Sequence, residues 1–142
     1  MLKKIKNILV PLDGSSASLK GLKLALTLAK GLDAKIFGVN IIRFSNGFQF
    51  PVSSEIKKMH IKSAEGIVSE AQKIAKKEKI PFVGKIIKAD NIGGEIVKIS
   101  KTKKVDLIII GSRGPYPGSE TFLGSVANYV LHKTNVPITI VK

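Results

Sequence analysis

Five short apolar runs alternate with longer amphipathic segments, and this alternation constrains the fold more than any other feature of the chain. The runs are rich in Ile, Val and Leu and are bounded by turn residues; they cover residues 8–12, 35–42, 82–87, 107–110 and 137–141. Continuous apolar runs of this length are typical of strands buried on both faces of a parallel sheet. We therefore expect an α/β fold in which residues 1–142 form a single doubly wound domain, with a five-stranded parallel sheet and helices on both faces.

The segments between the runs carry apolar residues at helical spacing. Ser15 or Ser16 is expected to cap the first helix, and Gly31 stands where its C-terminal cap is expected. Asn91 is expected to cap a third helix, and a fourth is predicted over 126–133.

The longest amphipathic segment predicts a second helix over 54–79. One face of this helix is lysine-rich, and we expect the opposite face to be buried. The residues of that apolar face are Ile56, Met59, Ala64, Ile67, Ala71, Ile74 and Ala75.

The chain contains no cysteine, which excludes disulfides and thiolate metal sites and suits a reducing compartment. Its first apolar run, residues 8–12, is too short for the core of a signal peptide or for a membrane span. We therefore expect a cytoplasmic protein that is not embedded in a membrane.

The formal net charge is +14, from 24 basic and 10 acidic residues. Only Arg43 and Arg113 are arginines, so the other 22 basic residues are lysines. Lysine is a strongly hydrated point charge, whereas base readout and bidentate phosphate contacts favour arginine. Because the lysines are scattered along the predicted helices, they indicate a solvated surface whose field attracts anionic ligands. Association with nucleic acid is the alternative.

The stretch GSRGPYPGSETFLGS, residues 111–125, joins the fourth strand to the fourth helix and contains four glycines. In a doubly wound sheet, ligands bind beyond the carboxyl ends of the strands, where the strand order reverses. A glycine-rich loop that runs into a helix can aim several backbone N–H groups at one anion. The natural ligand of such a loop is a phosphate group, and Asp13, after the first strand, would face it if the first and fourth strands are neighbours.

Two common phosphate motifs, the P-loop and the dinucleotide fingerprint, are missing from the chain. The glycines stand instead as Gly111-x2-Gly114-x9-Gly124-Ser125. With the flanking segments ILVPLDGSSAS, IFGVNII, VDLIIIGSRG and VPITIVK, this spacing resembles the ATP-binding branch of the universal stress protein family. The resemblance covers essentially the whole chain and implies the strand order 3-2-1-4-5.

The resemblance also implies a set of binding residues. An adenine nucleotide, ATP or else AMP or ADP, would be held through Pro11, Leu12, Asp13, Val39, Gly111, Gly114, Gly124, Ser125 and Val126. Of these, Asp13 would lie beside the ribose and Val39 would contact adenine through its main chain. Gly111 would pass under the ribose, and a divalent cation, Mg²⁺, would bridge the phosphates with Asp13 as its possible protein ligand. The resemblance further implies a homodimer that pairs through the last strand, 137–142.

Several of these residues have alternative interpretations. Asp13 could simply be a turn residue before Gly and Ser, and Ser15 is foremost a helix cap with any phosphate contact secondary. Arg113 could contact a phosphate or point into solvent. The spacer PYPGSETFL between Gly114 and Gly124 departs from the family pattern, since its prolines remove two backbone donors.

No residue of the chain is assigned a catalytic role. His60 and His132 have no Asp, Glu or Ser at a spacing that suggests a triad or a metal site. Without a P-loop lysine or an evident general base, we expect a nucleotide-binding regulatory protein of the stress-response type that hydrolyses ATP slowly at most. The alternative is a protein that binds no nucleotide and acts through interactions or nucleic acid.

Overall fold

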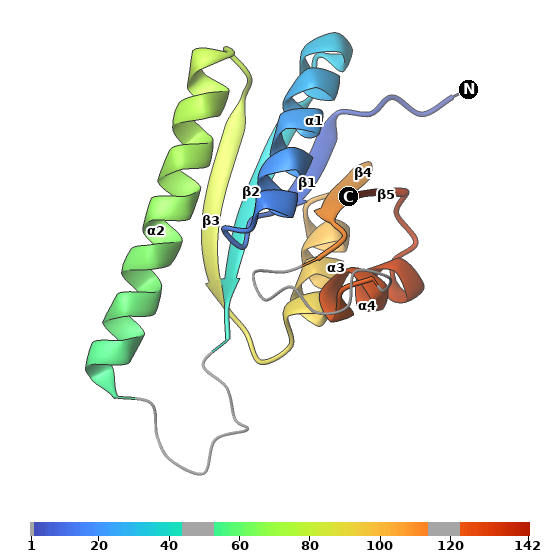
Figure 1. Cartoon of the computed structure of the whole chain (residues 1–142). Helices are drawn as coiled ribbons and strands as arrows, with labels where there is room; N and C mark the ends of the chain where they lie inside the picture. Colours follow the sequence, from blue (N-terminus) through green and yellow to red (C-terminus); the bar gives the residue numbers. More distant parts are fainter. Residues whose placement is uncertain (1, 44–52, 114–122) are drawn as a thin grey trace.

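The five predicted strands form one parallel sheet. The computed structural model describes residues 2–43, 53–113 and 123–142, and its strand order is β3-β2-β1-β4-β5. The strands are β1 (Asn7–Pro11), β2 (Lys35–Ile42), β3 (Phe82–Lys88), β4 (Leu107–Gly111) and β5 (Ile138–Val141) (Figure 1). The strand order implied by the family resemblance is therefore confirmed, and the strand boundaries differ from the predicted ones by one residue at most.

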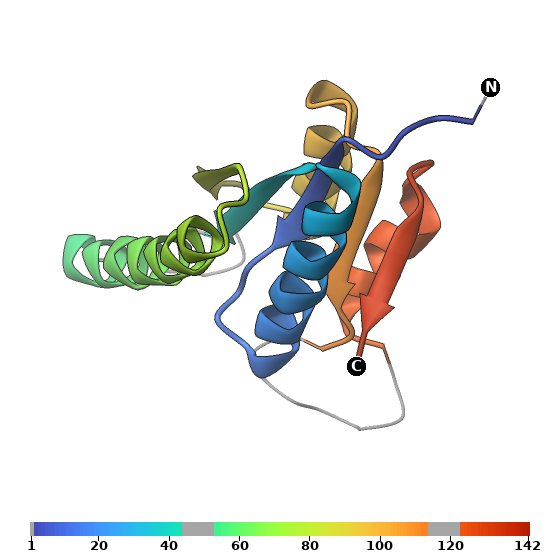
Figure 2. The same ribbon diagram turned by 90° about the horizontal axis from the view of Figure 1, so that it is seen from above.

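Within the described residues, four helices cover the two faces of the sheet. They are α1 (Ser16–Leu32), α2 (Ser54–Lys77), α3 (Ile92–Thr102) and α4 (Ser125–Lys133). Figure 2 shows α1 on one face of the sheet and α3 with α4 on the other, and α2 packs on the same face as α1. The chain thus has the doubly wound α/β architecture that the alternating pattern predicts.

Each face of the sheet has its own apolar core because successive strand side chains point to opposite faces. Ile8, Val10 and Ile109 pack with the buried residues of α1 and α2. Leu9 and Ile108 pack with the buried residues of α3 and α4. All five side chains are fully buried, which explains why these strands read as unbroken apolar runs.

The helix caps follow the sequence at the N-termini but not at the end of α1. Ser15 caps α1, its Oγ accepting a hydrogen bond from the Ser18 N–H at 3.1 Å, and Asn91 caps α3 through the Gly94 N–H at 2.9 Å. The predicted cap at Gly31 is wrong, because α1 continues through it to Leu32 and the C-cap residue is Asp33. Asp33 takes the left-handed conformation (φ 55°), which aspartate tolerates better than most residues.

The first turns of α2 are more exposed than the apolar pattern predicts. Ile56 is 46% exposed and Met59 is 68% exposed, whereas Ala64, Ala71 and Ala75 are buried as expected. A helix of 24 residues is about 36 Å long, and a strand of 7 residues spans only about 23 Å. The N-terminal end of α2 therefore extends past the end of β3 and finds no sheet to cover it (Figure 1).

Two strand glycines serve packing and not ligand binding. Gly38 and Gly84 lie opposite each other in the β2–β3 ladder. A Cβ atom at Gly38 would run into the ring of Phe82, and one at Gly84 would lie 2.5 Å from a Val68 methyl group. The close approach of Phe82 and α2 explains why both positions hold glycine.

Asp106 links β1 to β4 at the amino edge of the sheet. Its Oδ2 accepts hydrogen bonds from the backbone N–H groups of Lys6 at 2.8 Å and Asn7 at 3.0 Å, and its own N–H donates to the Asn7 carbonyl at 2.8 Å. The Lys3 ammonium lies 3.1 Å from Oδ1. Burial would raise the pKa of the Asp106 carboxyl, but the Lys6 and Asn7 amides and the Lys3 ammonium together hold that pKa below its ordinary value.

Candidate functional site

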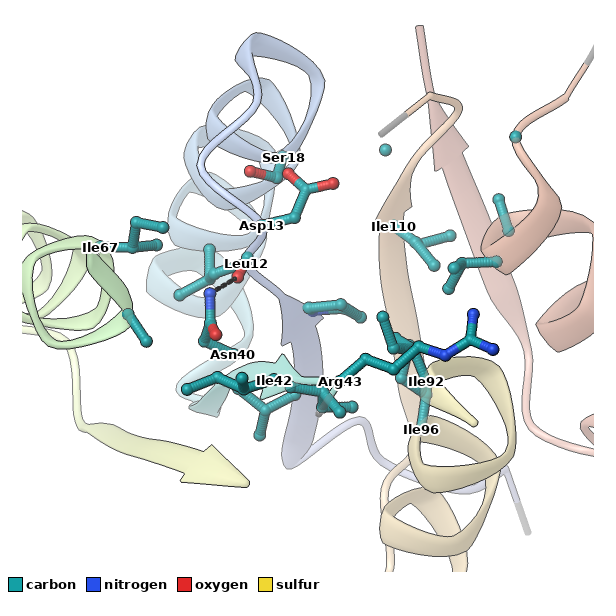
Figure 3. A pocket seen from close by; sticks show the side chains of 18 of the residues that line it. Leu12, Asp13, Ser18, Asn40, Ile42, Arg43, Ile67, Ile92, Ile96 and Ile110 are labelled. Atoms are coloured by element: carbon teal, nitrogen blue, oxygen red, sulfur yellow. Dashed lines mark hydrogen bonds between the residues drawn. The ribbon is translucent and has the colours of Figure 1, made fainter. Parts of the chain in front are cut away.

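A pocket of about 630 Å³ opens at the carboxyl ends of β1, β2 and β4. Side chains from both faces of the sheet line it, so the pocket extends over the edge of the sheet. Figure 3 shows it from close by, with Asp13 and Ser18 on one side and Ile110 across from them. The described lining residues are Pro11, Leu12, Asp13, Ser18, Val39, Asn40, Ile41, Ile42, Arg43, His60, Ser63, Ala64, Ile67, Ile92, Ile96, Ile110, Gly111, Ser112, Arg113, Gly124, Ser125, Val126 and Ala127.

The pocket lies where the strand order reverses. The chain proceeds from β1 outward through β2 to β3, then returns to place β4 on the other side of β1. Because β1 and β4 are parallel neighbours, the loops that follow them start side by side at the same edge of the sheet. This meets the condition under which Asp13 was expected to face the glycine-rich stretch. This is the place where open α/β sheets bind ligands.

Most of the predicted binding residues line this pocket. They are Pro11, Leu12, Asp13, Val39, Gly111, Arg113, Gly124, Ser125 and Val126. Ser15 is not among the described lining residues; its hydroxyl caps α1. Gly114 and the spacer residues 115–122 lie outside the described residues.

Asp13 is a turn residue that also lines the pocket. Its Oδ1 accepts a hydrogen bond from the Ser15 N–H at 2.8 Å, which closes the turn between β1 and α1. Gly14, within this turn, has φ 84°, a conformation in which other residues are strained. The two interpretations of Asp13 are therefore compatible, since the turn holds an exposed carboxylate at the pocket wall.

Gly111 has a packing role that its place in the motif does not suggest. A Cβ atom there would lie 2.9 Å from both the carbonyl carbon and the Cβ of Ala17, and 3.1 Å from the Ser18 N. The first turn of α1 thus lies directly against the end of β4. Whatever the pocket binds, this close contact by itself requires glycine.

The N-terminus of α4 forms the opposite wall of the pocket. Gly124 is the N-cap residue, with φ −60° and ψ 154°, and no side chain caps this helix with a hydrogen bond. Ser125 is the first helical residue, one residue before the predicted start of this helix. The Gly124 N–H donates to the Ser112 carbonyl at 2.6 Å, which fixes the start of α4 against the end of β4.

Asn40 is a site residue that the sequence analysis missed. It is only 8% exposed, and its Nδ2 donates to the Leu12 carbonyl at 2.7 Å, drawn as a dashed line in Figure 3. The Leu12 N–H donates in turn to the Val39 carbonyl at 2.7 Å. These two bonds hold the end of β1 against β2, and the signal in the sequence was a single polar residue within the apolar run IFGVNII.

Three further polar residues of the pocket were not predicted as site residues. Arg43 follows β2 directly, and His60 and Ser63 come from the exposed N-terminal half of α2. All three lie outside the glycine motif, and His60 and Ser63 were hidden by the amphipathic pattern of a long helix. The described pocket therefore carries one carboxylate, Asp13, against two guanidinium groups.

A metal ion has little support from the protein alone. Within residues 2–43, 53–113 and 123–142, no three His, Cys, Asp or Glu side chains come together to form a metal site. Mg²⁺ is usually bound through one or two carboxylates together with substrate phosphates. Asp13 fits the role of such a single carboxylate only if phosphates supply the other ligands.

The described part of the chain offers no transmembrane segment, since none of its helices combines the length and the apolar character needed.

Comparisons with known proteins identify the family of this chain. The model of the universal stress protein family matches residues 4–142. Universal stress protein YxiE of Bacillus subtilis is 30% identical, over 95% of this chain and 97% of its own. The solved structure of MJ0577 has a TM-score of 0.86 and is 26% identical, covering 99% of this chain and 97% of that one.

A further solved structure, the universal stress protein of Archaeoglobus fulgidus in complex with dAMP, has a TM-score of 0.75. It is 22% identical and covers 99% of this chain and 100% of that one. The family model spans almost every residue, and the YxiE alignment covers nearly all of both chains. The chain belongs to the universal stress protein family.

Proposed function

We propose that this protein is a stress-response regulator that binds an adenine nucleotide, ATP or AMP, in the pocket at the carboxyl edge of the sheet. The observation that carries the proposal is that Asp13 and the N-terminus of α4 line the same pocket on opposite sides of the β1–β4 crevice. Gly124, the N-cap residue, has no side chain to cap this helix. The dAMP complex of the Archaeoglobus fulgidus protein, which shares the fold, adds support.

The walls of the pocket suit the parts of a nucleotide. Leu12, Val39 and Ile110 offer apolar surface for a base, and the backbone at Gly124 and Ser125 offers N–H groups for phosphate. The first N–H groups of a helix have no partner within the helix, and the helix dipole attracts anions there. Asp13 would orient the ribose, and Arg113 would contact a phosphate.

The cation in this proposal is Mg²⁺ carried by the nucleotide. Asp13 would contribute one carboxylate oxygen, and the phosphates would supply the other ligands.

The small number of charged side chains in the pocket argues for slow hydrolysis of ATP. The described lining residues include no lysine and only one carboxylate, whose Oδ1 already accepts the Ser15 N–H. The protein would therefore act as a binding switch whose nucleotide state alters what partners encounter.

Thermal melting with and without nucleotide tests the proposal. A ligand at about 100 times its Kd stabilises the folded state by about 2.7 kcal/mol. For a domain of this size, that corresponds to a rise in melting temperature of roughly 5–10 °C. The expected result is such a rise with millimolar ATP and Mg²⁺ or with AMP. Unchanged melting with ATP, ADP and AMP would refute nucleotide binding.

The variant Gly124→Asp is the sharpest control for this experiment. Gly124 has β-region dihedral angles that any residue adopts, and aspartate is a preferred N-cap residue. The variant should therefore be as stable as the parent or more stable by a few tenths of a kcal/mol, and its melting temperature without ligand should be the same or slightly higher. Its carboxylate would occupy the place proposed for phosphate, so the nucleotide-induced rise should disappear. A rise that persists in the variant would place the phosphates elsewhere.

We also propose a homodimer that pairs through the last strand, residues 137–142. β5 lies at the edge of the sheet, where its outer N–H and C=O groups have no neighbouring strand within the described chain. Antiparallel pairing of two β5 strands about a two-fold axis would satisfy these groups. Light scattering at tens of micromolar should give twice the mass of the chain, and a monomeric mass would contradict the proposal.

Association with nucleic acid is the second candidate, and the net charge of +14 favours it. A purely electrostatic complex would weaken steeply between low and physiological salt and would not respond to nucleotide. DNA binding with that behaviour, together with unchanged melting on addition of nucleotide, would favour this function over the first.

A further inference from the structure

Arginine and lysine are sharply segregated in this protein. The chain has 22 lysines and two arginines, Arg43 and Arg113. Both arginines line the pocket, whereas none of the described lining residues is a lysine. Lysine is eleven times as abundant as arginine in this chain, yet both arginines line one pocket. This distribution points to a specific requirement for guanidinium groups there.

The two arginines are attached to the chain on opposite sides of β1. Arg43 is the first residue after β2, and Arg113 is the second residue after β4. Strands β2 and β4 are the two neighbours of β1, so the arginines flank the crevice in which Asp13 lies. Figure 3 shows the Arg43 side chain reaching from the end of β2 toward Ile92 and α3, across the floor of the pocket.

Arg43 is available for a ligand. Across the described residues, no carboxylate forms a salt bridge with it, and the salt bridges Lys3–Asp106 and Lys30–Glu78 lie away from the pocket. Arginine presents a planar fork of donors that matches two phosphate oxygens at once, which a lysine ammonium cannot do. The side chain is long enough to follow the pocket wall while its stem packs on apolar surface.

We infer that Arg43 is a specificity-determining residue that favours nucleotides with more than one phosphate. This inference rests on the proposed function. The N-terminus of α4 and Arg113 lie on one side of the crevice and hold the first phosphate. Arg43, whose side chain reaches from the end of β2 toward Ile92 and α3, pairs with a further phosphate that a nucleoside monophosphate lacks. The pocket therefore prefers nucleoside di- and triphosphates over monophosphates.

The test compares the binding of AMP, ADP and ATP by isothermal titration calorimetry in the full chain and in Arg43→Gln. Glutamine keeps much of the stem and some hydrogen bonding but removes the charge. The expected result is a loss of ATP and ADP affinity of about tenfold and a loss of AMP affinity below about threefold, as charge-assisted hydrogen bonds to a phosphate are lost. Because Arg43 is exposed, the melting temperature without ligand should not change.

Lys98→Gln is the matched control. Lys98 is an exposed residue of α3 that does not line the pocket, and its substitution removes the same charge from the protein. It should change the affinity for each nucleotide by less than about twofold, because a distant exposed charge is screened by salt. An equal loss for all three nucleotides in both variants would show a general field effect and would overturn the inference.

The remaining outcomes separate the inference from the proposed function. Equal affinities of the parent and Arg43→Gln for ATP would overturn the role of Arg43 while leaving nucleotide binding intact. An equal loss for AMP and ATP in Arg43→Gln alone would overturn the preference for polyphosphates. A parent protein that binds none of the three nucleotides would overturn both.

Discussion

Substitution of Gly111 by alanine is expected to lower the free energy of unfolding by about 2–3 kcal/mol, toward the upper end of the usual cost of overpacking. The added Cβ would lie 2.9 Å from the carbonyl carbon of Ala17 and 3.1 Å from the Ser18 N, both backbone atoms that cannot turn aside. The first turn of α1 would have to move away from β4. In a thermal melt without ligand, this corresponds to a decrease of roughly 5–10 °C.

Gly66→Ala is the matched comparison for this prediction. Gly66 lies within α2, is exposed, and a Cβ there would meet no atom within 4 Å. Alanine is favoured over glycine inside a helix, so this variant should gain about 0.5–1 kcal/mol. Equal effects of the two substitutions would contradict the packing role of Gly111. The expected result also means that weak nucleotide binding by a Gly111 variant cannot be assigned to a lost ligand contact without a stability measurement.

Substitution of Asp106 by asparagine should lower the free energy of unfolding by about 2 kcal/mol at neutral pH, within the range for hydrogen bonds to charged groups. The neutral amide keeps one acceptor oxygen but loses the charge that strengthens the bonds from the Lys6 and Asn7 amides. Lys3 contributes less, because its side chain is 80% exposed and such pairs are worth little. Urea unfolding of both proteins measures the difference.

The pH dependence of this difference has a defined sign. The pKa of Asp106 is lower in the folded protein than its ordinary value of 3.8, so the ionised carboxyl stabilises the fold fully above that value. This contribution is lost as the pH falls through the folded-state pKa. The gap between the parent and Asp106→Asn should therefore narrow on acidification below pH 3.8. Asp33→Asn, at the exposed C-cap of α1, should show no comparable loss of stability at neutral pH.

The architecture was predictable because its signals are local and repeated. Each strand is an unbroken apolar run, and each of the first three helices begins with a serine or asparagine cap. The errors fall where a distant element decides the outcome. Nothing near Gly31 reveals that α1 continues for one more residue, and the exposure of Ile56 and Met59 depends on where β3 ends.

The candidate site was predictable to the extent that a motif marks it. The glycine spacing pointed to Gly124 and Ser125, which line the pocket, but it could not reveal that Gly111 lies against the first turn of α1. Asn40 and Arg43 belong to no motif. Their importance depends on the packing of β2 between β1 and β3, which brings the end of an otherwise apolar strand to the pocket wall.

The bond from the Gly124 N–H to the Ser112 carbonyl ties together the two ends of the segment between them. The entropy of closing a loop grows slowly with its length, so each doubling costs only about 0.6 kcal/mol. This hydrogen bond therefore makes the position of the start of α4 independent of the length of the segment before it. The start of α4 keeps its position, while the stretch between Ser112 and Gly124, which includes PYPGSETFL, could change in length and sequence at little cost. A substitution or insertion in this stretch would thus leave the first turn of α4 in place.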